Sequence, residues 1–159
     1  MHPAVLTLDE LIVRFGPGKR NGKRVVFTNG CFDLLHPGHI YTLEQARLRG
    51  DVLVVGLNSD ESVRGLKGAH RPLIRAEERA EILASLESVD AVVIFDQTTP
   101  QRVIAALLPD ILVKGGDWPA DQIVGREEVE AAGGEVVRVE VVPGYSTSEI
   151  LKRITKGGD

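Results

Sequence analysis

Five short apolar runs alternate with amphipathic segments along most of the chain. The runs are rich in Val and Ile and cover residues 24–28, 51–57, 90–95, 110–114 and 135–142. The segments between and after them have apolar residues at helical spacing, which predicts helices over residues 38–49, 75–87, 99–107, 126–132 and 147–155. Continuous apolar strands separated by helices are typical of a parallel sheet covered on both faces. The pattern therefore predicts an α/β fold, a single-domain doubly wound (Rossmann-like) parallel sheet of about five strands.

The first 22 residues do not follow this alternation. Thr7 and Glu10 have the spacing of a capping box, which marks the start of a helix. Apolar residues at helical spacing follow it, namely Leu8, Leu11, Ile12 and Phe15. We expect an N-terminal accessory helix and loop over residues 1–22, the main domain over 23–156 and a flexible tail over 157–159.

Polar and glycine-rich residues follow four of the five predicted strands. The sequences are TNGCFDLLHPGH after the first, NSD after the second, KGGDW after the fourth and PGYSTSE after the fifth. A single loop of this kind is explained equally well by the needs of a turn. Ligands of doubly wound sheets bind outside the carboxyl ends of the strands, so four such loops on one edge favour a ligand site there.

Composition narrows the class of protein. The chain has 159 residues, of which 43% are hydrophobic, and its single cysteine, Cys31, excludes an intrachain disulfide or a cysteine zinc cage. The formal net charge of -4 argues against a nucleic-acid or anionic-membrane surface. No stretch approaches the ~20 apolar residues of a membrane span, and the N-terminus lacks a signal pattern. We therefore expect a cytoplasmic protein without a nucleic-acid or membrane partner.

The loop after the first strand ends in His36, Pro37, Gly38 and His39. Neither a P-loop nor a dinucleotide fingerprint is present, so this loop is the strongest candidate for phosphate binding. Pro37 suits a first helical turn, which predicts His36 near the N-cap and His39 beside it, close to unpaired N–H groups. Gly38 leaves room for an anion. The two histidines could instead bind a metal, but a zinc pair on a helix usually has a third ligand, and none is evident here. A structural alternative remains, in which one histidine caps the helix and the other lies on the surface.

The segment GCFDLLHPGH resembles the nucleotidyltransferase superfamily with the H-x-G-H signature. A second match is the helix start from Gly144 to Ser148, with Lys152 and Arg153 one turn later. Residues 24–155 resemble the adenylyltransferase domain of bifunctional heptose-phosphate enzymes in FTNGCFDLLHPGH, GLNSDESVRGLKGAHRPL, TPQRVIAALLPDILVKGGDW, IVGREEVEAAGGEV and GYSTSEILKRI. Nothing in the chain corresponds to the kinase domain of those enzymes.

The resemblance implies transfer of AMP from ATP to D-glycero-D-manno-heptose 1-phosphate. It also implies Mg²⁺ as cofactor, held mainly by the triphosphate with no protein metal site, a separate heptose kinase in the pathway and a homodimer. One alternative is a cytidylyltransferase for glycerol 3-phosphate or a similar small phosphate. Another is a nucleotide-binding module without catalysis.

Site residues follow from the loops and the resemblance together. We expect His36, His39 and Lys67, a flexible charge in a Gly-flanked loop, to act on the phosphates. Asp33 and Arg71 are expected to bind the acceptor. The predicted nucleotide-binding residues are Thr28, Asn29, Gly30, Gly38, Lys114, Gly115, Gly116, Asp117, Tyr145, Ser146, Thr147 and Ser148.

Simpler explanations exist for several of these residues. Ser146 and Glu149 also have capping-box spacing, Lys67 and Arg71 could be solvated loop cations, and Asp33 could form a turn. Trp118 could border a pocket or lie on the surface. Cys31 is expected to be a small packing residue.

Overall fold

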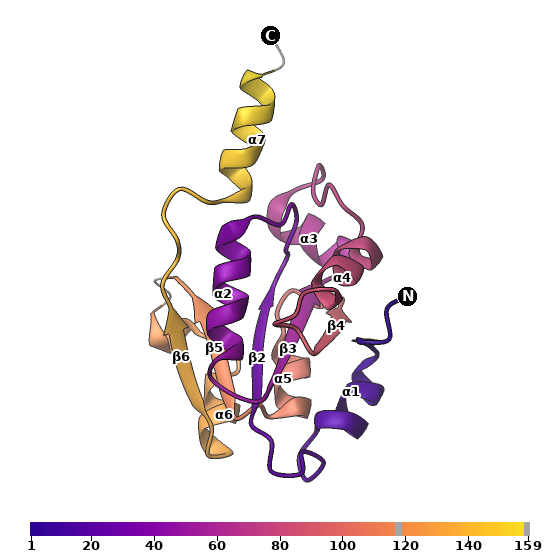
Figure 1. The fold of residues 1–159 in the computed structure, drawn as a ribbon, viewed down its shortest axis with the longest axis vertical. Helices are drawn as coiled ribbons and strands as arrows, with labels where there is room; N and C mark the ends of the chain where they lie inside the picture. The colour runs from indigo at the N-terminus through magenta and orange to yellow at the C-terminus, as the bar shows by residue number, and fades with distance from the viewer. Residues whose placement is uncertain (117–118, 158–159) are drawn as a thin grey trace.

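The structure is a computed structural model that describes residues 1–116 and 119–157 (Figure 1). Its strands are β1 (Val5–Leu6), β2 (Val25–Gly30), β3 (Val52–Asn58), β4 (Ala91–Phe95), β5 (Ile111–Gly115) and β6 (Glu135–Val139). Its helices are α1 (Leu8–Phe15), α2 (Pro37–Arg47), α3 (Asp60–Lys67), α4 (Ala76–Ala84), α5 (Gln101–Leu107), α6 (Arg126–Ala131) and α7 (Thr147–Lys156), with a 3₁₀ turn η1 (Ala120–Gln122).

The described strands form a six-stranded parallel sheet in the order β1-β4-β3-β2-β5-β6. From β2 the chain moves outward through β3 to β4, then returns to the other side of β2 and continues through β5 to β6. The strand order therefore reverses between β2 and β5, where Val26 pairs with Ile111. The predicted doubly wound fold is confirmed, and its switch point lies between the carboxyl ends of these two strands.

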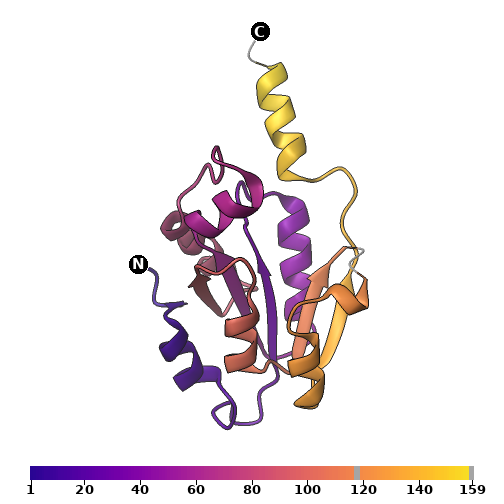
Figure 2. The same ribbon diagram turned by 180° about the vertical axis from the view of Figure 1, so that it is seen from behind.

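Helices cover both faces of the sheet because alternate strand residues point to opposite sides (Figures 1 and 2). On one face, Val26 packs in a core cluster with Leu43 of α2 and Leu83 of α4. On the other face, the cluster of Phe27 includes residues of three further helices, namely Leu11 of α1, Val103, Ile104 and Leu107 of α5, and Val129 of α6. Two apolar cores therefore fix the sheet, and the βα loops lie at its carboxyl edge.

Besides the 3₁₀ turn η1, one strand and one α-helix of the fold were not predicted. The two-residue strand β1 pairs with β4 and makes the sheet six-stranded rather than five-stranded. Helix α3 begins after Ser59, whose side chain accepts a hydrogen bond from the Ser62 N–H at 3.2 Å. Lys67 is the last residue of α3, so its predicted place in a loop is wrong. Residues 29 and 30, predicted to follow the first strand, are instead the last two residues of β2.

The two ends of the chain differ in how they pack. Thr7 and Glu10 form the predicted capping box, and Leu11 of α1 is fully buried. The division of the chain at residue 22 stays a prediction. At the other end α7 has no buried residue and projects beyond the sheet in both views (Figures 1 and 2). None of the helices in the described ranges is long and apolar enough to cross a membrane.

Candidate active site

A cleft of about 550 Å³ opens at the carboxyl edge of the sheet. It gathers fifteen of the predicted site residues, namely Thr28, Asn29, Gly30, Asp33, His36, Gly38, His39, Lys67, Arg71, Lys114, Gly115, Tyr145, Ser146, Thr147 and Ser148. Gly116 follows β5 but is not among the residues that line the cleft, so its contact with the nucleotide stays a prediction. Asp117 and Trp118 lie outside the described residues. Loops far apart in sequence thus meet at the predicted switch point.

The two histidines form the start of α2. His36 is the N-cap residue, Pro37 follows at the first position, and His39 is the third residue of the helix. The Gly38 N–H donates to His36 Nδ1 at 3.1 Å, and the His36 N–H donates to His39 Nδ1 at 3.3 Å. The rings stack with centroids 3.8 Å apart. Both histidines therefore cap the helix and both line the cleft.

Burial keeps both imidazoles neutral. It lowers the pKa of His36 below its usual value. Burial, together with the charges of His36 and Lys67, lowers the pKa of His39 to about 4. A neutral ring that accepts through Nδ1 carries its proton on Nε2. Each ring therefore retains one N–H donor that the caps do not use, beside the positive end of α2.

Glycine at position 38 is required by the packing around it. A Cβ there would lie 3.0 Å from the His36 ring and 3.0 Å from the Tyr145 Cβ. Tyr145, which precedes α7, also lies parallel to the His36 ring, with centroids 6.2 Å apart. The predicted room for an anion at Gly38 stays a prediction.

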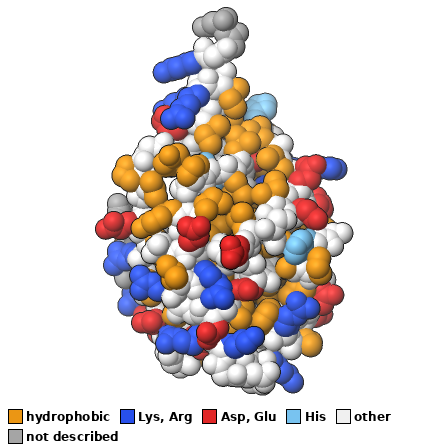
Figure 3. Space-filling model, viewed as in Figure 1, with side chains coloured by type: hydrophobic (Ala, Val, Ile, Leu, Met, Phe, Trp, Pro, Cys, Tyr) orange, Lys and Arg blue, Asp and Glu red, His pale blue; other side chains and the backbone are white. Residues whose placement is uncertain are grey.

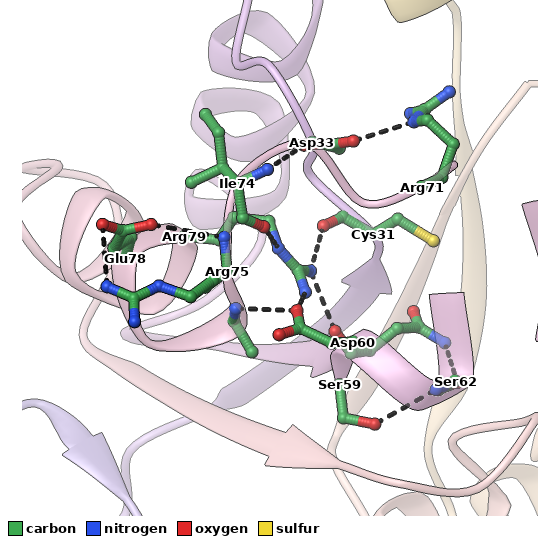
Figure 4. Close-up of polar contacts among 12 residues, drawn as sticks. Cys31, Asp33, Ser59, Asp60, Ser62, Arg71, Ile74, Arg75, Glu78 and Arg79 are labelled. Carbon is green, nitrogen blue, oxygen red and sulfur yellow. Dashed lines mark hydrogen bonds and ion pairs between the residues drawn. The ribbon is translucent and has the colours of Figure 1, made fainter. Parts of the chain in front are cut away.

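The loop between β2 and α2 holds a buried carboxylate. Asp33 is flanked by Phe32 and Leu34, which both adopt left-handed backbone angles. Its fully buried carboxylate accepts from Arg71 Nε at 2.8 Å and the Ile74 N–H at 3.1 Å (Figure 4). It also accepts from the Leu73 N–H at 2.8 Å. Burial acts to raise its pKa, but these hydrogen bonds outweigh burial and lower it. Asp33 is therefore an ionised anchor for Arg71.

Arg71 has donor capacity left over. Its Nε bonds Asp33, whereas its Nη2 is buried and has no hydrogen-bond partner, unlike the other buried side-chain nitrogen and oxygen atoms of the described residues. Buried polar groups without partners are rare and costly in native proteins. Because Arg71 also lines the cleft, an anionic ligand that reached Nη2 would supply the missing acceptor.

Helix α7 begins at the cleft. Ser146 is its N-cap, and its side chain accepts from the Glu149 N–H at 3.0 Å, as the capping alternative predicts. Thr147 Oγ1 donates to the Asp33 carbonyl at 2.8 Å, which joins this helix start to the β2–α2 loop. Ser148 is exposed and lines the cleft. The helix start therefore lies near the histidines with N–H groups available for phosphate oxygens.

On the other side of the switch point, Lys114 ends β5 beside Asn29 of β2. Its Nζ donates to Asn29 Oδ1 at 2.5 Å, and no carboxylate of the described residues forms an ion pair with it. Burial lowers the pKa of Lys114 to about 8. A buried ammonium with only an amide oxygen as partner is costly, and a ligand anion would offset that cost.

Several residues of the site were missed by the sequence reasoning. Additional lining residues are Phe32, Thr42, Asn58, Leu66, Thr98 and Val141, and Cys31, expected to pack, also lines the cleft. Burial raises the pKa of the Cys31 thiol. Beneath the cleft, Arg79 and Asp60 form an ion pair at 2.7 Å (Figure 4). A signal was available, because Arg79 is a charged residue on the apolar face of a predicted helix.

The described residues contain no group of three or more His, Cys, Asp or Glu side chains that could hold a metal. Asp33, a carboxylate in the cleft, is already bonded to three N–H donors. A divalent cation entering this cleft would therefore take most of its oxygen ligands from a triphosphate and water.

Known proteins resemble this chain in sequence over most of its length. A model of the cytidylyltransferase-like family matches residues 27–153. The bifunctional protein HldE of Methylobacillus flagellatus is 53% identical over 150 residues, and that of Geotalea uraniireducens is 56% identical over 153. These matches cover 94% and 96% of this chain but 31% of each relative. The chain thus spans less than a third of the length of these curated relatives.

Solved structures agree with the fold. The lipopolysaccharide core biosynthesis protein from Thermoplasma volcanium matches with a TM-score of 0.63 and 27% identity, over 76% of this chain and 98% of that protein. Pantoate-beta-alanine ligase from Francisella tularensis shares the fold, with a TM-score of 0.61 and 14% identity over 91% of this chain and 68% of the ligase. The resemblance based on the two motifs is confirmed by the family match, which covers both of them. The chain belongs to the cytidylyltransferase-like family.

Proposed function

We propose that this chain transfers AMP from ATP to D-glycero-D-manno-heptose 1-phosphate and releases pyrophosphate. The observation that carries the transfer chemistry is the stacked pair His36 and His39, neutral and each with one N–H donor left over at a helix N-terminus. The choice of substrates is supported by the identity of 53% and 56% to proteins named HldE. The lipopolysaccharide core biosynthesis protein of similar fold supports the same substrate class.

The reaction requires positioning and charge stabilisation rather than a covalent protein nucleophile. An oxygen of the sugar phosphate attacks the α-phosphorus of ATP, and the bond from that phosphorus to the bridging oxygen of pyrophosphate breaks. Negative charge shifts onto the leaving pyrophosphate, where the Nε2–H groups of His36 and His39 would donate hydrogen bonds. Lys67 would approach the α-phosphate from the end of α3. The N–H groups at the start of α7 would bind the β- and γ-phosphates.

The acceptor side of the cleft would be formed by Arg71. Its unpartnered Nη2 suits a phosphate oxygen, and its Nε is already held by Asp33. Asp33 would therefore act indirectly. Its carboxylate orients Arg71 and already accepts hydrogen bonds from the N–H groups of Leu73 and Ile74. The predicted direct contact of Asp33 with the acceptor stays a prediction.

Mg²⁺ is part of the proposal, because members of this family typically use a divalent metal. Bound to the triphosphate, it would neutralise charge between two anionic substrates. Lys114 in its protonated form would add a positive charge on the side of the cleft opposite Arg71, where it would attract the anionic substrates.

The proposed setting is cytoplasmic. The sugar 1-phosphate would be supplied by a separate heptose kinase, as the family resemblance implies. A homodimer is proposed as well. An apolar groove beside His36, lined by Leu35, Pro37, Ile40 and Tyr41, supports it. Figure 3 shows hydrophobic side chains gathered on the face that carries α2. The lack of buried residues in α7 supports it further.

The test is a pyrophosphate-release assay. With Mg²⁺, the pair ATP and D-glycero-D-manno-heptose 1-phosphate should give a kcat/KM about 10⁴-fold above that of CTP and glycerol 3-phosphate, because buried donors left unpaired by a wrong base discriminate strongly. A higher kcat/KM for the CTP pair would leave the family intact and reject the heptose assignment. Nucleotide binding without pyrophosphate release on any sugar phosphate would favour a binding module.

A further inference from the structure

Arg79 is the largest fully buried side chain of the described residues, and it bonds three separate segments. It lies on α4 with an exposed fraction of 1%. Its Nε donates to the Ile74 carbonyl at 2.8 Å, and its Nη1 donates to the carbonyls of Cys31 at 2.6 Å and Asn58 at 2.8 Å. Its Nη2 pairs with Asp60 Oδ1 at 2.7 Å. The loop after β2, the segment from the end of β3 to the start of α3, and the loop before α4 therefore share one guanidinium (Figure 4).

We propose that Arg79 is a positioning residue for the acceptor side of the cleft, which it serves by holding the Asp33–Arg71 pair together. The proposal rests on the function proposed above. Asp33 and Arg71 belong to different segments, and the pair forms only if the two segments keep their relative position. Arg79 holds the first segment at Cys31, two residues before Asp33, and the second at Ile74, three residues after Arg71.

Asp60 strengthens this connection from α3. Its Oδ1 accepts from both the Arg79 Nη2 and the Ala76 N–H, at 2.7 Å and 2.8 Å. Helix α3 carries Lys67 at its far end, so the same network also fixes the helix that brings this cation to the cleft. A guanidinium is suited to such a junction because its donors have a fixed planar geometry, which an ammonium cannot reproduce.

The hydrogen-bond partners of Arg79 are Ile74, Cys31, Asn58 and Asp60, and none of these residues is proposed to bind phosphate. The chain contains a matched control in Arg20, which likewise donates to three carbonyls, those of Phe15, Leu107 and Leu108, and pairs with Asp110. Arg20 lies at the amino end of the strands, because Asp110 directly precedes β5 and bonds the first residue of β2. Substitution of either arginine is expected to lower stability, so only the effect on the acceptor separates them.

The experiment compares R79K and R79M with R20K and R20M in the full chain. For the Arg79 variants we expect KM for D-glycero-D-manno-heptose 1-phosphate to rise roughly 10- to 100-fold, the effect of losing a hydrogen bond to a charged group. KM for ATP should rise less than KM for the sugar phosphate, because the histidines and the N–H groups of α7 are positioned by α2 and α7 and, of the groups on the ATP side, only Lys67 depends on α3. The Arg20 variants should keep both KM values while their Tm falls.

A measurement on the free protein decides the same point without substrate. In ¹H–¹⁵N spectra of arginine side chains, the Arg71 Nε–H should be protected from solvent exchange by its bond to Asp33. This protection should be lost in R79K and kept in R20K. If R79M does not fold, R79K and D60N replace it, since both conserve volume.

The outcomes separate the two proposals. Equal loss of Arg71 protection and equal rises in acceptor KM in the Arg79 and Arg20 variants would show that Arg79 merely stabilises the fold. A wild-type protein without turnover of the heptose phosphate would reject the proposed function, and the Arg71 signal would still decide the role of Arg79. Unchanged protection in R79K would overturn the positioning role whatever the substrate.

Discussion

The two ends of the sheet are built with the same chemistry but are completed differently. At the amino end, the guanidinium of Arg20 has three carbonyls and Asp110 as partners, and Asp110 also accepts from the Val25 N–H at 2.7 Å. At the carboxyl end, Arg79 has a similar set of partners, but the groups above it do not. Arg71 has a buried nitrogen without a partner, and Lys114 has an amide oxygen in place of a carboxylate.

This difference separates polar networks that stabilise the fold from polar groups that have donors left for a ligand. A network whose donors and acceptors are all paired contributes to stability and specificity. A rigid frame that leaves single donors unpaired costs stability, and a bound anion would offset that cost. Backbone strain does not make the same distinction. Left-handed residues occur both at the carboxyl end, as at Phe32, and at the amino end, as at Leu108.

The largest expected effect belongs to the histidines at the carboxyl end. Replacement of His36 or His39 by Ala should lower kcat by about 10²–10³, because each ring supplies a donor to developing charge. The Tm should fall by only a few degrees, the effect of losing one helix cap, since the rings are only partly buried. His2→Ala, which lies outside the cleft, is the control and should keep normal turnover in the pyrophosphate assay. A variant with near-normal kcat would remove that histidine from the mechanism.

The second largest effect is expected on the KM for the sugar phosphate, in a comparison of two aspartates at opposite ends of β2. D33N weakens the anchor of Arg71, so KM for the sugar phosphate should rise roughly 10- to 100-fold, the range for a hydrogen bond to a charged group. D110N weakens the bonds to Arg20 and to Val25 and should lower Tm without a change in KM. Steady-state kinetics and thermal unfolding on both variants make the comparison. A rise in acceptor KM in D110N of the same size would mean that the two ends are not independent.

The sequence predicts the sheet well because its strands are buried runs with a clear pattern. It does not predict β1, since two residues carry no periodicity, or α3, whose Gly65 and neighbouring polar residues look like a loop. The histidine motif could be placed correctly because Pro37 and the spacing of three dictate a helix start. A charged residue on the apolar face of a predicted helix indicates that Arg79 is buried, but its partners could not be predicted, because they are three carbonyls from distant segments and main-chain acceptors do not depend on residue type.

Removal of a hydrogen-bonded cation usually lowers the stability of the folded protein, but removal of the Lys114 ammonium should raise it. Burial lowers its pKa from 10.5 to about 8, so its ammonium destabilises the folded state below pH 8. Between about pH 8 and 10.5 the unfolded chain binds more protons, and the free energy of unfolding should rise with pH. K114M should abolish this rise and be about 2 kcal/mol more stable at pH 7, while ATP binds roughly 10-fold more weakly.

Denaturant unfolding at several pH values and ATP titration measure these two quantities. The matched control is K23M, an exposed lysine near the amino end of β2, which should change neither. A K114M protein less stable than the wild type at pH 7 would show that the bond to Asn29 outweighs desolvation. Lys114 would then belong with the fully paired groups of the amino end.

The smallest expected effect concerns acid pH and His39. Burial and the charges of His36 and Lys67 lower its pKa to about 4, against 6.5 for an ordinary histidine. As the pH falls from 6.5 to 4, the unfolded chain gains a proton that the folded ring does not, so the free energy of unfolding decreases across this range. H39Q, which caps the helix without titrating, should lose about 1 kcal/mol less than the wild type, a value reduced for the partial exposure of the ring. The measurement is denaturant unfolding of both proteins at pH 7 and pH 4.5. Equal losses would place the titration at other groups and would show that the neutral histidine pair does not distinguish the carboxyl end.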